Sequence, residues 1–190
     1  INYLITGGAG FIGSNLIEKV ITKADKVIVV DNLITGDTKN ISKFQKQENF
    51  EYIEHDIQKS IYLDEKIDYV VHLASCASPK AYSKYPINTL KSGSIGTINA
   101  LGISNQHNAK FFLASTSEIY GDPEVSPQNE NYWGNVNTLG PRSMYDESKR
   151  FAESAVHAYV QTHGLTGNIA RIFNTYGPNM QINDGRVVTN

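Results

Sequence analysis

The sequence predicts an α/β fold, a Rossmann-like doubly wound parallel sheet in one domain. Two observations carry this prediction. Apolar, β-branched runs alternate along the chain with amphipathic helical patterns, and the first of these runs leads directly into a glycine-rich turn. The 190 residues, 40% of them hydrophobic, suffice for a single substantial core. We expect strands at about 2–6, 26–30, 50–54, 68–74, 110–115 and 166–172, and helices at about 11–22, 86–107 and 143–163, with a shorter helix near 38–47.

The first strand and its turn carry the strongest functional signal. Gly7, Gly10 and Gly13 leave no side chains where a pyrophosphate would approach the backbone. The helix that begins near Phe11 would direct its free N–H groups at that anion. The second strand ends at Asp31, whose carboxylate can accept both hydroxyls of an adenosine ribose and would repel a 2′-phosphate. This order predicts NAD rather than NADP; the alternative is a glycine-rich hairpin or helix cap.

Glycines also interrupt the second expected helix, 86–107. Gly93, Gly96 and Gly102 disfavour helix formation. We therefore expect another backbone or a cofactor to approach this helix closely.

The stretch 121–142 is rich in proline and glycine and predicts a long loop, which its Tyr132 and Trp133 indicate to be ordered. The helix expected after it, 143–163, is amphipathic. Its apolar face is predicted to consist of Phe151, Ala152, Ala155, Val156, Tyr159 and Val160.

A tyrosine and a lysine one helical turn apart are candidates for proton transfer. Tyr145 and Lys149 share a helix face, and a nearby ammonium lowers a tyrosine pKa from its usual value near 10. The phenolate could then remove a proton from a sugar hydroxyl while hydride leaves the same carbon. Tyr62 and Lys66 have the same spacing but lie in an ordinary connection before a buried strand. We therefore assign catalysis to Tyr145 and Lys149.

Polar residues end three of the expected strands, at the edge where ligands bind in such sheets. Ser115 and Thr116 end the fifth strand, so Thr116 could hydrogen-bond the reacting hydroxyl, and Glu118 could act on a neighbouring ring carbon or carboxylate. The alternative is that Thr116 and Ser117 merely end a strand. Asp56 could accept from an adenine amino group or simply stabilise a turn. Small residues within 72–75 would let a cofactor pass.

Composition excludes several classes of protein. The formal net charge of −2 gives no basic field for nucleic acid. Cys76 is the single cysteine, which excludes an internal disulfide, and we interpret it as structural and typical of a reducing, cytoplasmic compartment. We find no 18-residue apolar run. No metal is expected, because the histidines lack ligand spacing: His55, His72, His107, His157 and His163.

Six sequence motifs together resemble those of the extended short-chain dehydrogenase/reductases that act on nucleotide sugars. The resemblance covers essentially the whole chain, and it is strongest to the branch that decarboxylates UDP-glucuronate. Sister 4,6-dehydratases usually carry Thr-Asp-Glu where this chain has Thr116-Ser117-Glu118, and 4-epimerases usually lack the glutamate. The motifs span residues 6–14, 114–123, 132–137, 140–150, 170–178 and 183–188.

The resemblance also implies which residues meet the ligands. Together with Gly7, Gly13 and Ser115, the NAD site would contain Gly10, Phe11, Ile12, Asp31, Asn32, Thr35, Gly36, Asp56, Ile57, Leu73, Ser75, Ser92, Tyr145, Lys149, Thr175 and Arg186. The substrate would meet Lys91, Asn99, Tyr159 and Asn174. The chain departs from the family where Gly93 replaces a usual Asn, Cys76 a Pro, Met144 a Cys or similar residue, and Ser148 a Gly. Gly93 puts one polar contact near the cofactor or active site in doubt.

The activity implied by the resemblance is NAD-dependent conversion of UDP-glucuronate to UDP-xylose through C4 oxidation, loss of carbon dioxide and re-reduction. A 4,6-dehydratase, a 4-epimerase or an inactive NAD-binding fragment are the alternatives. The family suggests a homodimer formed by helices 86–107 and 143–163. Because the chain stops soon after its sixth expected strand, we expect residues 1–190 to be an NAD-binding domain that lacks most of a C-terminal substrate lobe, and to expose apolar surface there.

Overall fold

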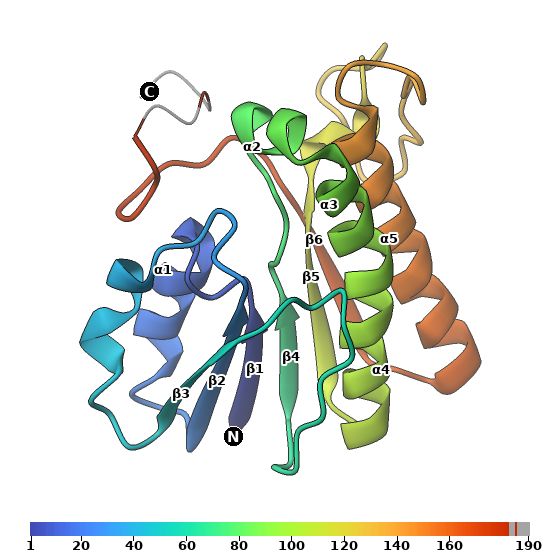
Figure 1. The fold of residues 1–190 in the computed structure, drawn as a ribbon. Helices are drawn as coiled ribbons and strands as arrows, with labels where there is room; N and C mark the ends of the chain where they lie inside the picture. The colour runs from blue at the N-terminus through green and yellow to red at the C-terminus, as the bar shows by residue number, and fades with distance from the viewer. Residues whose placement is uncertain (183–184, 186–190) are drawn as a thin grey trace.

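A computed structural model describes residues 1–182 and 185, and within them six strands form one sheet with helices on both faces (Figure 1). The strand order is β3-β2-β1-β4-β5-β6, and every neighbouring pair is parallel. The predicted fold class is therefore confirmed. The strands are β1 Asn2–Thr6, β2 Lys26–Asp31, β3 Phe50–Glu54, β4 Tyr69–His72, β5 Lys110–Thr116 and β6 Gly167–Ile172.

Successive residues of β1 pack into two separate hydrophobic cores, one on each face of the sheet. In β1, Leu4 packs into the core beneath α4 (Thr97–His107) and α5 (Ser143–His163), and Ile5 packs into the core beneath α1 (Phe11–Val20). Successive strand side chains point to opposite faces, so both residues are fully buried. The apolar runs of the sequence are therefore explained by helices on both faces.

The chain reverses direction across the sheet between β1 and β4, which are neighbours although β2 and β3 lie between them in sequence. On one side of this point the chain builds β2 and β3, and on the other β5 and β6. Connections above the two strands diverge there and leave a crevice at their carboxyl ends. The fold thus places the ends of β1, β2, β4 and β5 around one opening.

The expected helix 86–107 is divided into three pieces: α3 Pro86–Lys91, a π-helical turn η3 Ser92–Gly96, and α4. The predicted approach of another backbone is confirmed at Gly93, where a Cβ would lie 2.9 Å from the backbone O of Ser148, whereas at Gly96 a side chain approaches instead. A Cβ on Gly93 would lie 2.5 Å from Cβ of Ser148 on α5, and one on Gly96 would lie 2.9 Å from Cγ2 of Ile57. The prediction is wrong for Gly102, which has nothing within 4 Å.

Two short segments differ from the expected elements. Near 38–47 the chain makes two 3-10 turns, Thr38–Asn40 and Ser42–Phe44, instead of a helix. The additional helix α2, Pro79–Lys84, was not predicted. The sequence does contain a helix-start pattern here, a serine followed by a proline. Ser78 caps the helix by accepting a hydrogen bond from Ala81 N at 3.3 Å, and Pro79 occupies its first position.

The stretch 121–142 is a loop, as expected. Tyr132 stacks on Tyr120 with ring centroids 5.9 Å apart, and Gly121 pairs with Asn135 in an isolated bridge. The indole of Trp133 does not contribute to this packing, because the residue is 87% exposed. On α5, Ala152, Ala155 and Val156 are buried as predicted, whereas Phe151 is 44% exposed. Among the helices that the structure describes, none has the length and apolar character needed to cross a membrane.

Candidate active site

A cleft of about 460 Å³ opens at the carboxyl ends of the strands. Residues from the glycine-rich turn, from the ends of β2, β4 and β5 and from α5 line it, so the two halves of the predicted site face the same space. The predicted residues that line it are Gly7, Gly10, Phe11, Ile12, Gly13, Asp31, Asn32, Thr35, Ile57, Leu73, Ser75, Ser92, Ser115, Thr116, Glu118, Tyr145, Lys149, Asn174 and Thr175.

The glycine-rich turn is packed too tightly for side chains. Gly7 has φ +73°, and a Cβ there would lie 2.7 Å from Ala74 N; a Cβ on Gly13 would lie 2.5 Å from Gly7 O. Gly10 caps α1 without any side-chain hydrogen bond, so the first N–H groups of the helix remain available to an anion. The turn leads into a helix rather than a second antiparallel strand, which excludes the hairpin alternative.

Asp31 is 8% exposed and held by backbone N–H groups of the two turns that follow β1 and β2. Its Oδ2 accepts from Ala9 N at 3.0 Å and its Oδ1 from Leu33 N at 2.9 Å. Burial raises the pKa of this carboxyl, while the N–H groups oppose the rise. Asp31 therefore also fixes the shape of the turn, a structural role that the sequence analysis missed. A carboxylate oxygen can accept more than one hydrogen bond, so both remain able to meet ribose hydroxyls.

Tyr145 and Lys149 lie on one face of α5, as predicted from their spacing. The Lys149 ammonium lies 5.9 Å from the centre of the Tyr145 ring and donates to Ala114 O at 2.8 Å. Burial lowers the pKa of Lys149 to about 8. The Tyr145 ring is also stacked on Tyr82, with centroids 5.2 Å apart and planes at 13°. Tyr62, of the pair with the same spacing, is 81% exposed and outside the cleft.

Thr116 and Glu118 lie where β5 turns into a 3-10 helix. The Thr116 hydroxyl oxygen accepts from Glu118 N at 3.2 Å. The Glu118 carboxylate forms an ion pair with Arg142 at 2.8 Å, and both side chains line the cleft. Arg142 was not among the predicted site residues, although it ends a Gly-Pro-Arg motif just before Tyr145.

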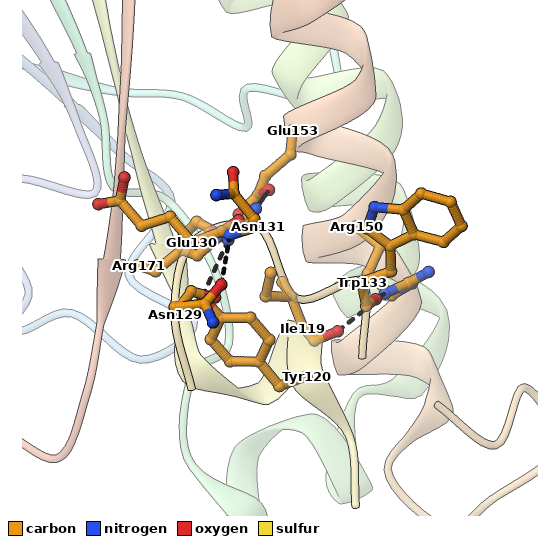
Figure 2. A network of polar contacts seen from close by, with 10 residues as sticks. Ile119, Tyr120, Asn129, Glu130, Asn131, Trp133, Arg150, Glu153 and Arg171 are labelled. Carbon is orange, nitrogen blue, oxygen red and sulfur yellow. Dashed lines mark hydrogen bonds and ion pairs between the residues drawn. The ribbon is translucent and has the colours of Figure 1, made fainter. Parts of the chain in front are cut away.

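A polar network behind the cleft holds the loop 121–142 (Figure 2). The Arg171 guanidinium makes two hydrogen bonds to Glu153, at 3.0 and 2.8 Å, and donates to Tyr120 Oη at 2.9 Å and Glu130 O at 2.8 Å. Ser115 Oγ donates to the same Glu153 at 2.5 Å. The network therefore links the loop to the strand end beside Thr116. Sequence reasoning missed it because its members lie on five separate segments: β5, the 3-10 turn at 117–120, the loop 121–142, α5 and β6.

His72 ends β4 two residues before Ala74, which lines the cleft, and makes hydrogen bonds whose directions can be assigned. Thr97 Oγ1 donates its one hydrogen to Gly93 O at 2.8 Å, so it must accept from His72 Nε2–H at 3.2 Å. His72 Nδ1 then accepts from Thr6 Oγ1 at 2.7 Å, and Thr6 in turn accepts from Ala74 N at 3.4 Å. Burial lowers the pKa of His72 to about 3, which keeps the ring neutral as this pattern requires.

The segment 173–182 crosses the cleft from β6 to α1. Asn15 Nδ2 donates to Pro178 O at 2.8 Å, and Gln181 Nε2 donates to Thr35 O at 2.7 Å. Figure 1 shows the red coil that follows β6 passing above the sheet toward α1. The segment contributes several lining residues and joins the two halves of the cleft.

Two predicted cofactor residues, Gly36 and Asp56, lie apart from the cleft lining. Gly36 stands behind Asp31, where a Cβ would lie 2.9 Å from Oδ1. Asp56 Oδ1 accepts from Gln58 N at 3.0 Å, the turn contact that its alternative interpretation foresaw. Arg186 falls outside the described residues.

Three predicted substrate residues also lie apart from it. Lys91 is exposed at the end of α3, and Asn99 Nδ2 donates to Ile57 O at 2.8 Å. Tyr159 is 14 residues beyond Tyr145, about 21 Å along α5, and packs on a hydrophobic core and His163. Direct contact between Tyr159 and a sugar in the cleft is therefore not expected.

Within the described part of the chain, no group of histidine, cysteine and acidic side chains could hold a metal ion. Cys76 is buried, and burial raises the pKa of its thiol. Ser75 Oγ is buried in the cleft wall with no hydrogen-bond partner among the described residues. Such an atom fits a site completed by a polar ligand.

The fold and the cleft define the class: a Rossmann-type domain with a tyrosine–lysine pair at the carboxyl edge of its sheet, as in the extended short-chain dehydrogenase/reductases. The chain belongs to the GDP-mannose 4,6 dehydratase family, whose profile matches residues 4–190. This confirms the resemblance found in the sequence.

Particular relatives narrow the comparison. The chain is 52% identical over 187 residues to UDP-glucuronic acid decarboxylase 1 of Xenopus tropicalis, covering 98% of this chain and 44% of the relative. It superposes with a TM-score of 0.84 on the dTDP-glucose 4,6-dehydratase DesIV of Streptomyces venezuelae, solved with NAD bound, at 27% identity over 95% of this chain and 58% of that one. The UDP-glucose 4-epimerase of Thermotoga maritima, solved with UDP-glucose, superposes with a TM-score of 0.82 at 32% identity, over 94% of this chain and 57% of that one. The chain thus spans about half the length of the curated relatives it matches.

Proposed function

We propose that this chain is the NAD-binding half of an enzyme that decarboxylates UDP-glucuronate to UDP-xylose. The observation that carries the proposal is that Tyr145, Lys149, Thr116 and Glu118 line the same cleft as the glycine-rich turn. The 52% identity to a UDP-glucuronic acid decarboxylase supports the choice of reaction. Thr116-Ser117-Glu118 favours it over a 4,6-dehydratase or a 4-epimerase.

The residues present fit NAD. The side-chain-free turn and the first N–H groups of α1 suit a pyrophosphate, and the buried acid Asp31 suits an unphosphorylated ribose. Ser75 would gain the polar partner that it lacks among the described residues. Lys149 would reach the second ribose from behind Tyr145. Bound NAD supplies reversible hydride acceptance at C4 of the sugar.

The chain's own residues would manage protons and orientation. Tyr145 takes the proton of the C4 hydroxyl, and Thr116 hydrogen-bonds the same oxygen. The resulting 4-keto sugar is a β-keto acid, so the bond from C5 to the carboxyl carbon can break with its electron pair entering the ketone as an enolate. C5 then takes a proton from water, and Tyr145 returns its own proton to O4 when the ketone is reduced by hydride. Glu118 follows Thr116 by two residues, which would place it near C5 and its carboxylate.

Product analysis tests the reaction. The full encoded protein is incubated with NAD and a panel of UDP- and dTDP-sugars, and products are identified by mass spectrometry. UDP-xylose and carbon dioxide from UDP-glucuronate support the proposal, whereas a 4-keto-6-deoxy sugar or a C4 epimer supports an alternative. We propose that residues 1–190 alone bind NAD but turn over slowly, and that added downstream sequence restores activity. Exposed apolar residues after β6 fit a covering lobe: Phe173, Tyr176 and Ile182.

We also propose a cytoplasmic homodimer. The outer surface of α3, η3, α4 and α5 exposes apolar side chains that a symmetric partner would cover. These are Ile87, Leu90, Ile95, Ile98 and Phe151, which are 38% to 59% exposed. The single, buried cysteine supports a reducing compartment. Light scattering at micromolar concentration tests the dimer, and a monomer contradicts it.

A further inference from the structure

We propose that Arg142 is the specificity-determining residue of the cleft: it binds the carboxylate of a nucleotide-linked uronic acid, and Glu118 takes the place of that carboxylate while the site is empty of sugar. The inference rests on the proposed function and deepens it. It assigns the choice between a uronate and a neutral hexose to one side chain.

The charges in the cleft point to Arg142. Among the described residues that line it, the lysine and arginine side chains are Arg142 and Lys149. Lys149 is 6% exposed and its ammonium donates to Ala114 O, behind Tyr145. The Arg142 side chain is 50% exposed. Arg142 is therefore the cation that an incoming anionic substituent can reach.

Its position matches the chemistry of the sugar. Arg142 precedes Tyr145 by three residues at the start of α5, and its partner Glu118 follows Thr116 by two. If Tyr145 and Thr116 hold O4, a substituent on the adjacent carbon C5 lies beside these neighbours. In a uronate that substituent is a carboxylate, which a guanidinium can bind through two parallel hydrogen bonds.

The resting ion pair is suited to exchange. Glu118 is 31% exposed, and a partly solvated pair contributes little to stability, so a second carboxylate can displace it or share the guanidinium. A guanidinium has five N–H donors. Burial raises the pKa of the Tyr82 hydroxyl and the nearby Arg142 charge opposes that rise, and the Tyr82 ring stacks on Tyr145, so the cation lies close to the proposed base.

The test measures binding, separately from turnover, in the full encoded protein with saturating NAD. Dissociation constants of UDP-glucuronate and UDP-glucose are determined by titration calorimetry for the unchanged protein and for Arg142→Ala, Arg142→Lys and Glu118→Gln. Arg142→Ala should weaken UDP-glucuronate about 10- to 100-fold, the loss of one charge-assisted pair, and leave UDP-glucose within about twofold. Arg142→Lys should recover part of the loss. Lys84→Ala, which removes an exposed cation outside the cleft lining, should change neither.

Glu118→Gln separates this role from a merely structural one. If Glu118 competes for Arg142, its neutralisation should tighten UDP-glucuronate and leave UDP-glucose unchanged. If Arg142 serves only to hold Glu118, both variants should weaken the two sugars alike, and the proposal is overturned. It is also overturned if the unchanged protein does not prefer the uronate. Failure of the proposed function is a different result, normal binding of NAD and UDP-glucuronate without carbon dioxide release.

Discussion

Replacing Gly93 by alanine should separate two helices that support the cleft. The new Cβ would lie 2.5 Å from Cβ of Ser148, 2.8 Å from its Oγ and 2.9 Å from its backbone O. A rotamer change can move the hydroxyl, but neither Cβ nor the carbonyl can move without shifting α5. Overpacking of this kind typically costs about 1–3 kcal/mol. At about 2–4 °C per kcal/mol for a chain of this size, the melting temperature should fall by roughly 2–12 °C.

Gly102→Ala is the matched control. Gly102 lies in α4 of the same predicted helix, and a Cβ there would meet nothing within 4 Å, so alanine should stabilise the protein by up to about 1 kcal/mol through helix propensity. Thermal and urea unfolding of the two variants should therefore change in opposite directions. A second change, Ser148→Gly, should relieve part of the Gly93→Ala loss, because it removes two of the three close atoms. Equal stability of the two alanine variants would refute the packing argument.

Three further outcomes are expected. Burial raises the pKa of Asp146 to about 6, above its usual value near 4, so the ionised carboxylate lowers the stability of the fold above about pH 6. Asp146→Asn should therefore raise the free energy of unfolding at pH 8 and leave it unchanged at pH 4. An equal effect at the two pH values contradicts this. Asp31→Asn, which keeps one acceptor for the turn, should weaken NAD relative to NADP in fluorescence titrations; an unchanged ratio argues against ribose recognition. Tyr145→Phe should lower turnover about 10²–10⁴-fold in the full encoded protein with little change in NAD affinity, and near-normal turnover excludes Tyr145 as the base.

Local sequence patterns were enough to predict the sheet and the site residues that lie directly on its strands and on α5. The strand ends were predictable because β-branched runs are buried on both faces, and Tyr145 and Lys149 because helical spacing alone puts them on one face. The same reasoning could not place Asn99 or Tyr159. Their contacts depend on how α4 and α5 dock on the sheet, which sequence spacing does not encode.

The resemblance named two substitutions without linking them. Gly93 and Ser148 are each a departure from the family pattern, 55 residues apart in sequence, yet they touch in the fold. Relative to the family pattern, residue 93 is smaller (Gly for Asn) and residue 148 is larger (Ser for Gly). The two substitutions therefore compensate each other in packing. Arg142 was missed for a related reason: its partner Glu118 approaches only after the long loop returns to α5.

The crossing segment 173–182 has a mechanical consequence. The two halves of the sheet meet at the β1–β4 ladder, so widening the cleft amounts to a hinge rotation about that ladder. The segment spans the open side of the cleft and is held to the α1 side by three hydrogen bonds. Two of them are those of Asn15 and Gln181 described above, and in the third Asn179 Nδ2 donates to Ser14 Oγ at 3.0 Å. Opening must break these anchors together. A molecule bound beneath the segment would then leave only after these anchors open as well as its own contacts with the turn and Asp31, so the segment would slow its exchange with solvent.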